Sequence, residues 1–189
     1  MWNSIQQIFG QFIQGLIPNR QMNPSDHKEI KMKLSNNFTL DELTKSDTAT
    51  RLGIDNQPTP EQLECLRALA HNILQPVREH FNKSTEVSSG LRGDVLNKKI
   101  GGSKTSQHCF GEAADFTVKG VPHHIVAEWI RDNLNFDQLI LEFYDEKTQT
   151  GWIHCSFKVS GNRKSVLQAV KQKDKNGKMK TVYLNGLDN

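Results

Sequence analysis

The pattern of hydrophobic positions divides the chain into a helical part followed by a β-rich part. Hydrophobic residues recur at three- and four-residue spacing from Leu63 to Val77, which predicts a helix with one buried face. This helix is expected to begin at residues 59–62, where threonine and glutamine form a capping box around a proline in the first turn. Pro76 should kink the helix near its end or close it. A second capping box, at residues 39–42, predicts a shorter helix before it.

Short runs with β character begin at residue 85. We expect strands at 85–89, 113–118, 139–144 and 152–159, and a helix at 123–134. Residues 90–106 are rich in glycine and polar side chains and predict a long loop. The polar residues 145–151 predict a hairpin turn, and Asn176-Gly177 predicts another between 166–170 and 181–184. Helices ahead of such strands indicate an α+β fold, a small antiparallel sheet with helices packed on it.

The same pattern suggests four segments. Residues 1–17 repeat hydrophobic side chains at helical spacing, which predicts an amphipathic helix, and the polar residues 18–36 predict a linker. Residues 37–160 are expected to form the main domain and residues 161–189 a C-terminal β-hairpin extension. The N-terminal helix would pack on the domain or on a partner protein, and a membrane surface or an assembly is the alternative. It has no basic start, so it makes no convincing signal peptide.

Composition adds modest constraints. A hydrophobic content of 35% suits one core, and a net charge of +3 would help contact with an anionic polymer such as bacterial cell wall. It is not a nucleic-acid signature, and no nucleic-acid partner is expected. The basic excess collects in the C-terminal hairpin, which is either solvated or a binding patch. The lysines concerned are Lys171, Lys173, Lys175, Lys178 and Lys180.

Two histidines and one aspartate carry the candidate chemistry. A glycine and two alanines separate His108 from Asp115, and small residues allow a loop and a strand to converge there. His154 lies in a later β-rich run. Two imidazoles and one carboxylate are the ligand set of a catalytic zinc site with one open position, where the metal activates water for attack on a carbonyl. Taken singly, each histidine would be an ordinary loop or strand residue.

A glutamate on the neighbouring predicted strand is the candidate general base. If the turn centres near Thr148, Glu142 falls opposite His154. There it could take a proton from the attacking water and pass it to the leaving amine. The alternative is a solvent-facing strand end, with Asp145 or Glu146 taking the role if the register slips.

The cysteines show no disulfide framework, because there are three of them at unrelated spacings. Cys65 lies on the apolar face of the predicted helix and is expected in the core. Cys109 and Cys155 each follow a candidate ligand, and in a strand they would point to the opposite face, so we expect buried thiols rather than ligands.

The motif Ser106-x-His108-x-x-Gly111-x-Ala113-x-Asp115, followed by Trp152-x-His154, resembles the zinc D-Ala-D-Ala carboxypeptidase and L-alanyl-D-glutamate endopeptidase family. These enzymes cleave the peptide stems of peptidoglycan and include many bacteriophage lysins. The resemblance covers about residues 36–160. Upstream it includes residues 38–43, 46–49, Asn56 and Pro58, the helix at 66–78, and residues 89–92.

The resemblance assigns roles to individual residues. It implies that His108, Asp115 and His154 are the zinc ligands. It also implies that Arg92 binds a substrate carboxylate or steadies the oxyanion, a role suited to a planar and permanently charged guanidinium. Without the resemblance, Arg92 would be interpreted as a surface arginine on a loop.

One position departs from the family pattern. Many relatives carry an acidic base three residues before the last histidine, where this chain has Gly151. Residues 136–142 followed by 153–156 instead resemble the Hedgehog signalling domain and its peptidase cousins, which place the glutamate on the preceding strand and so support Glu142. Hedgehog keeps the zinc site yet is not known as a peptidase, so the resemblance supports Zn²⁺ binding more strongly than turnover.

The leading hypothesis is a zinc-dependent peptidase that hydrolyses an amide bond in the peptide stems of peptidoglycan. A non-catalytic zinc module that binds cell wall or a protein partner is the second hypothesis. A structural virion protein that docks through residues 1–17 is compatible with either. A phage lysin would be made in the host cytoplasm and act in the periplasm or cell wall, or would be virion-associated.

Overall fold

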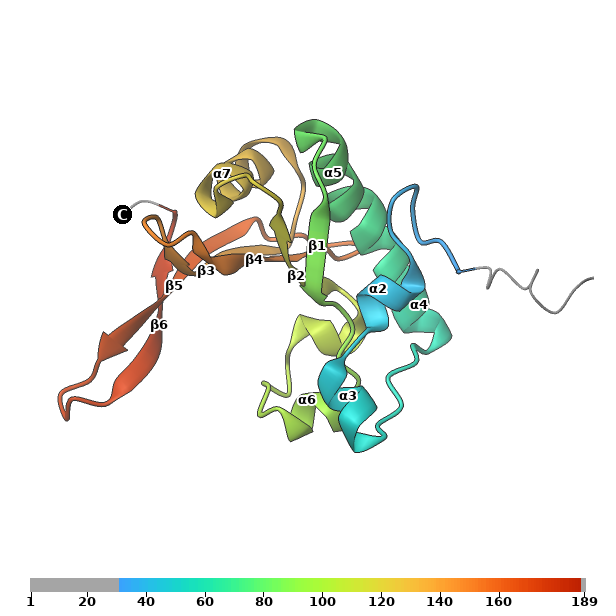
Figure 1. Cartoon of the computed structure of the whole chain (residues 1–189), viewed down its shortest axis with the longest axis horizontal. Helices are drawn as coiled ribbons and strands as arrows, with labels where there is room; N and C mark the ends of the chain where they lie inside the picture. Colours follow the sequence, from blue (N-terminus) through green and yellow to red (C-terminus); the bar gives the residue numbers. More distant parts are fainter. Residues whose placement is uncertain (1–30, 188–189) are drawn as a thin grey trace, which may run out of the picture. The chain divides into compact units, whose positions relative to one another are not determined.

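Six strands form one sheet, in the order β1-β2-β4-β3-β5-β6, in the computed structural model, which describes residues 31–187 (Figure 1). Neighbouring strands are antiparallel except β3 and β5, which are parallel. The strands are β1 (Thr85–Ser89), β2 (Ala113–Val118), β3 (Gln138–Asp145), β4 (Thr150–Ser156), β5 (Ser165–Lys173) and β6 (Met179–Asn185). The predicted α+β fold and the two predicted hairpins are therefore confirmed.

The helices precede the strands or lie between them. They are α2 (Leu40–Thr44), α3 (Asp47–Leu52), α4 (Pro60–Leu69), α5 (Gln75–Phe81), α6 (Asp94–Lys99) and α7 (His123–Asn133). Both predicted capping boxes are present, at Thr39 and at Thr59. The sequence pattern missed α6, which lies inside the expected loop 90–106, because a helix of six residues is too short to show a hydrophobic period.

Pro76 does not close the long helix. A π-helical turn, η2 (Ala70–Leu74), joins α4 to α5, and Pro76 lies in the first turn of α5. In a π turn the backbone hydrogen bonds join residues five apart rather than four. The helix can therefore accommodate proline, which has no backbone N–H to donate. The helix continues to Phe81 and ends at Asn82, whose left-handed conformation terminates it.

One face of the sheet packs on the helices. Side chains that alternate along β2, β3 and β4 meet α4, η2, α5 and α7, and α7 lies above the strands in Figure 1 while α6 lies below them. The other face of β2, β3 and β4 carries the candidate site. The fully buried members of the core include Leu66, Leu69, Ile73, Phe116, Ile130, Phe136, Leu139 and Ile153.

The β3–β4 hairpin has a different register from the one predicted. His154 pairs with Ile140, and Glu142 pairs with Trp152, so the prediction that Glu142 lies directly opposite His154 was wrong. A bulge between Glu142 and Asp145 shifts the pairing, and Phe143 within it has φ of 51°. The shift is two residues, an even number, so Glu142 stays on the same face as His154 and lies diagonal to it.

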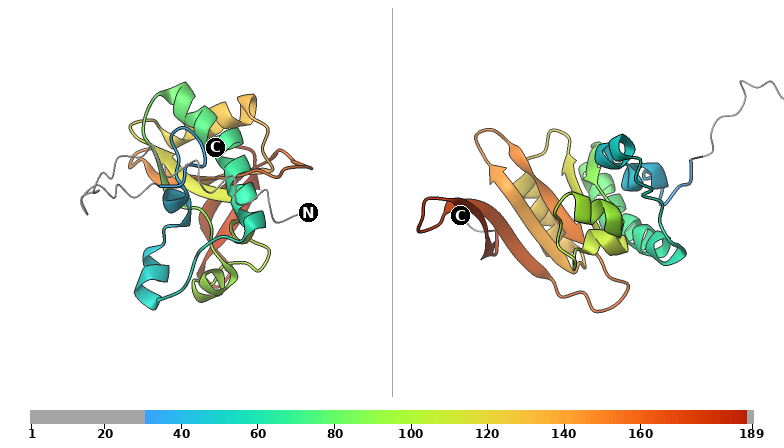
Figure 2. Two further views of the ribbon diagram at one scale, coloured as in Figure 1. Left: turned by 90° about the vertical axis from the view of Figure 1, so that its right-hand side faces the viewer. Right: turned by 90° about the horizontal axis from the view of Figure 1, so that it is seen from below.

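The segments at both ends of the described residues belong to the same fold as the sheet and its core. β5 and β6, from the expected C-terminal extension, pair onto the sheet and reach away from the helices (Figures 1 and 2). β4 ends at Ser156, because residues 158–162 form a loop that Asn162 closes through hydrogen bonds to the Lys158 backbone. Of the expected linker, residues 31–36 are described and place Leu34 in the core. The predicted helix at 1–17 and the linker residues 18–30 lie outside the described residues.

Two of the three cysteine predictions are confirmed. Cys109 and Cys155 are buried, and burial raises the pKa of the Cys155 thiol. Cys65 is half-buried rather than a core residue, because it lies at the edge of the buried face of α4. All three are free thiols.

In the region from residue 31 to residue 187, no helix has the length and apolar character needed to cross a membrane.

Candidate metal centre

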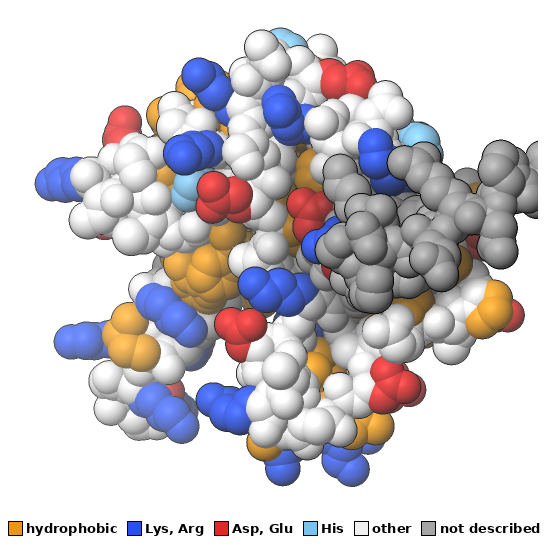
Figure 3. Space-filling view, turned by 45° about the vertical axis from the view of Figure 1, so that its right-hand side comes forward, with side chains coloured by type: hydrophobic (Ala, Val, Ile, Leu, Met, Phe, Trp, Pro, Cys, Tyr) orange, Lys and Arg blue, Asp and Glu red, His pale blue; other side chains and the backbone are white. Residues whose placement is uncertain are grey.

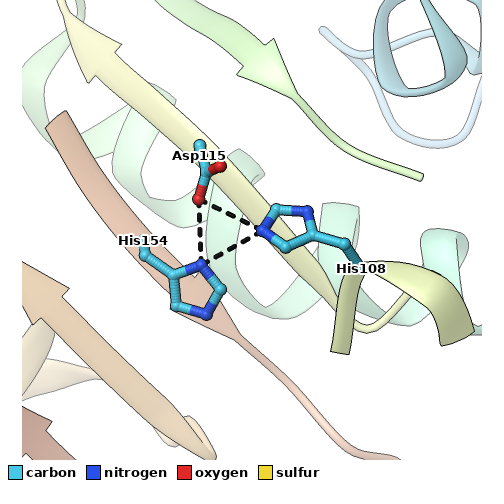
Figure 4. A group of neighbouring side chains, drawn as sticks. All are labelled: His108, Asp115 and His154. Carbon is cyan, nitrogen blue, oxygen red and sulfur yellow. Dashed lines mark hydrogen bonds and ion pairs between the residues drawn. The ribbon is translucent and has the colours of Figure 1, made fainter. Parts of the chain in front are cut away.

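Three side chains from three separate elements converge on one point (Figure 4). His108 lies in the short 3₁₀ helix η3 (Gln107–Phe110), Asp115 on β2 and His154 on β4. Asp115 and His154 are directly paired across the two strands, so the sheet register alone places their side chains side by side. The structure therefore brings together the three residues that the sequence analysis selected.

The distances between their ligand atoms suit a metal ion. His108 Nε2 lies 3.2 Å from Asp115 Oδ1 and 3.2 Å from His154 Nδ1, and His154 Nδ1 lies 2.9 Å from Asp115 Oδ1. Two ligand atoms of a tetrahedral zinc site lie about 3.3 Å apart when each is about 2.0 Å from the metal. The triangle thus has nearly the dimensions of one face of such a site, and it leaves the fourth position open. These residues fit a zinc ion.

A backbone carbonyl orients the first ligand. His108 Nδ1 donates a hydrogen bond to the Gly90 carbonyl oxygen over 2.7 Å, which turns Nε2 toward the other two ligands. Such a bond fixes the tautomer of a metal-binding imidazole. Gly90 has to be glycine, because a Cβ there would collide with the Leu43 carbonyl oxygen. Its close approach to α2 thus sets the position of the carbonyl that holds His108.

Electrostatics keep the ligands in the forms that bind metals. Burial lowers the pKa of His108, which favours the neutral imidazole. Burial alone would raise the pKa of Asp115, but hydrogen bonds and charge interactions with His108 and His154 outweigh it and hold that pKa below its ordinary value. A neutral imidazole beside an ionised carboxylate is the state that a divalent cation requires.

Glu142 faces a cavity of about 570 Å³ that His108 and His154 also line. Burial raises the pKa of this glutamate, and the negative charge of Asp115 raises it further. A carboxyl group whose pKa lies nearer to neutrality is better suited to accept and return a proton. The structure places Glu142 beside the metal site without a direct contact to a ligand, although the predicted register was wrong.

Gly151 cannot carry an acid in this fold. It has φ of 97°, and a Cβ there would collide with the Glu142 carbonyl oxygen and lie 2.8 Å from the Tyr144 backbone nitrogen. The bulged strand β3 therefore passes directly against this residue. The turn residues Asp145 and Glu146, which the sequence left as alternatives, are exposed and do not line the cavity that contains Glu142.

Arg92 lies behind the carboxylate ligand. Its Nη2 is 3.4 Å from Asp115 Oδ2, and its buried Nε has no hydrogen-bond partner among the described residues. Arg92 also lines two cavities, the one that contains Glu142 and a second of about 280 Å³ that reaches Asp115 from the other side. Because its guanidinium lines both cavities, Arg92 can contact an anionic ligand in either of them.

Sequence reasoning missed a buried carboxylate that supports the site. Asp137 is fully buried and ion-paired to Arg163, and it accepts a hydrogen bond from Gln107 Nε2 over 3.0 Å. Gln107 precedes His108, so this network ties the ligand-bearing η3 to the sheet. The only signal in the sequence was a charged residue between Phe136 and an apolar strand, which equally describes a loop.

A buried site of two histidines and one aspartate, with an open position and a glutamate in the adjoining cavity, is the arrangement found in metal-dependent hydrolases. The family model for Peptidase M15 matches residues 36–156, well over half of the chain. The chain belongs to the Peptidase M15 family, whose members are in general zinc-dependent. Among curated proteins, no sequence matches the chain.

Proposed function

We propose that this protein is a zinc-dependent peptidase that hydrolyses an amide bond in the peptide stems of peptidoglycan. The family membership supports a metallopeptidase. The observation that carries the proposal is the triangle of His108, Asp115 and His154, whose ligand atoms have tetrahedral spacing, with Glu142 in the cavity that the two histidines line.

The metal ligands, Glu142 and Arg92 would each have a separate role in hydrolysis. Zinc, when bound by the triad, supplies a Lewis acid that polarises the scissile carbonyl and lowers the pKa of water. Glu142 takes the proton from the attacking water and passes it to the leaving amine, which its raised pKa favours. Arg92, whose guanidinium lines the cavity beside Glu142, binds a substrate carboxylate or the developing oxyanion.

The shape of the site favours cleavage within a stem over removal of its last residue. Two cavities adjoin the triad, one of about 570 Å³ that Glu142 and His154 line and one of about 280 Å³ that Asp115 lines, and Arg92 lines both. A carboxypeptidase needs only a short closed pocket beyond the scissile bond. The second cavity gives a peptide room to continue past the scissile bond, so we infer endopeptidase activity.

Digestion of purified sacculi tests this function. We expect the zinc-loaded protein to release new amino groups, chelation to abolish the release, and added zinc to restore it. Mass spectrometry of the products then identifies the bond: new internal amino termini indicate an endopeptidase, and free D-Ala indicates a carboxypeptidase. Stoichiometric zinc with no cleavage would contradict the proposal and favour a non-catalytic module that binds cell wall or a protein partner.

A further inference from the structure

A row of four paired residues crosses the sheet beside the metal centre. Trp152 on β4 pairs with Glu142 on β3, Glu142 pairs with Ala169 on β5, and Ala169 pairs with Tyr183 on β6. Directly paired residues place their side chains on the same face of a sheet. The phenol of Tyr183 therefore lies on the face that carries the proposed general base, one small residue away from it.

Ala169, which lies between Glu142 and Tyr183 in this row, lets their side chains approach each other closely. Ala169 is fully buried and has only a methyl group, so it leaves space between the side chains on either side of it. Tyr183 lines the same cavity as Glu142, His108 and His154. Burial raises the pKa of Tyr183, and the charge of Glu142 raises it further, which agrees with their proximity.

Tyr183 is nevertheless open to a ligand. It is 55% exposed, and its hydroxyl has no hydrogen-bond partner among residues 31–187. A large aromatic side chain that is exposed at the wall of a cavity offers a rigid apolar face and a polar tip, the combination that recurs where proteins bind peptides. It also lies beyond residue 156, where the family match ends.

We propose that Tyr183 is a substrate-positioning residue: its ring packs against the peptide beyond Glu142, and its hydroxyl donates a hydrogen bond to a carbonyl or carboxylate oxygen of the substrate. This inference rests on the proposed function. It assigns part of the substrate cleft to the C-terminal hairpin, so the metal centre and the wall of its cleft come from different parts of the chain. The hairpin thereby influences which stem peptides fit.

Steady-state hydrolysis of a soluble stem-peptide muropeptide by the zinc-loaded full chain tests the role of Tyr183. For Tyr183→Ala we expect KM to rise about tenfold with kcat changed less than about threefold, because ground-state and transition-state binding are lost equally. Tyr183→Phe keeps the ring and loses one hydrogen bond, so its KM should rise about threefold to fivefold. Leu184→Ala on the same strand does not line the cavity and serves as the matched control, with kinetics like the wild type.

The possible results distinguish failure of the Tyr183 proposal from failure of the proposed function. An unchanged KM in Tyr183→Ala, while the wild type cleaves the muropeptide, overturns the role of Tyr183 and leaves the proposed function intact. A wild type that neither cleaves nor binds it overturns both. Calorimetric binding to the Glu142→Gln background provides a readout without turnover, where adding Tyr183→Ala should weaken affinity about tenfold. If the alanine variant does not fold, Tyr183→Phe decides alone: KM equal to the wild type overturns the hydrogen bond and with it the proposal.

Discussion

At the scale of single residues, the proposed catalysis depends on Glu142. Glu142→Gln preserves size and shape but removes the group that accepts a proton. We expect unchanged zinc content and a kcat at least about 100-fold lower, within the range that general-base catalysis contributes. Zinc stoichiometry and kcat measured on the same preparation check this.

Glu146→Gln is the matched control, because it makes the same exchange in the exposed turn of the same hairpin. It should cleave at the wild-type rate. A Glu142→Gln enzyme with full activity and an inactive Glu146→Gln enzyme would reverse the assignment.

Lys171 offers a second test, through pH. Its positive charge is one of the influences that lower the pKa of Glu142, with those of His154 and Arg92, against burial and Asp115, which raise it. Glu142 must be ionised to accept a proton, so activity is lost as the pH falls through its pKa. Lys171→Met removes a lowering influence and should therefore move the acidic limb of the kcat/KM profile to higher pH.

Lys173→Met, two residues further along β5 and away from the cavity, should leave that limb in place. A shift to lower pH in Lys171→Met would contradict the sign of the electrostatic argument.

Much of the site at this scale could be predicted from the sequence. The sequence motif and the family resemblance selected His108, Asp115 and His154, and the structure brings these three side chains together. Asp115 and His154 lie side by side because they pair across neighbouring strands. Gly151 looked like a departure from the family, but it is a steric necessity that only the folded hairpin reveals. Tyr183 could not be found, because its place depends on the pairing of β3, β5 and β6.

At the scale of elements, the buried Asp137 connects η3 to the loop that follows β4. Hydrogen bonds with Arg163 lower the pKa of Asp137, so its ionised form stabilises the fold. Asp137→Asn should lower the free energy of unfolding by about 1–3 kcal/mol, the usual cost when a buried charged hydrogen bond loses its partner. It should also weaken zinc binding, since Gln107 adjoins His108.

Chemical denaturation at several pH values checks the origin of this effect. Because the folded-state pKa is lowered, the stabilisation is complete above the unfolded-state pKa and disappears as the pH falls through the folded-state pKa. The difference between wild type and Asp137→Asn should therefore shrink in acid. Asp132→Asn, an exposed carboxylate paired with its neighbour Arg131, is the control and should leave the free energy of unfolding nearly unchanged.

Elements with a clear period were predictable, and irregular ones were not. The strands at 85–89 and 113–118 alternate regularly and were predicted with the bounds that the structure shows. The β3–β4 register failed because a bulge leaves no mark on hydrophobic alternation. The π turn before Pro76 likewise depends on the packing of the long helix rather than on a local motif.

At the scale of the whole molecule, metal binding should stabilise the fold, since the ligands come from η3, β2 and β4. A ligand that binds only the folded state raises the melting temperature by mass action. We expect zinc to raise the Tm of the metal-free protein by several degrees and chelation to reverse the change. His154→Ala should abolish this response, whereas His71→Ala, an exposed histidine on η2, should retain it.

Surface charge does not by itself identify a partner at this scale. Lys and Arg side chains are spread among acidic and neutral ones over the face that Figure 3 shows. The five lysines of the β5–β6 hairpin are all exposed, as a solvated hairpin requires. The proposal that the protein acts on peptidoglycan therefore depends on the metal centre and the family rather than on a basic patch.

The parallel pairing of β5 with β3 has a practical consequence for the design of truncated fragments. The family match ends at residue 156, and a fragment that stopped there would leave β3 with a bare row of unpaired backbone groups. Such free strand edges recruit other chains and cause aggregation. An expressed catalytic fragment should extend through β6, and insolubility of shorter fragments would say nothing about the integrity of the catalytic residues.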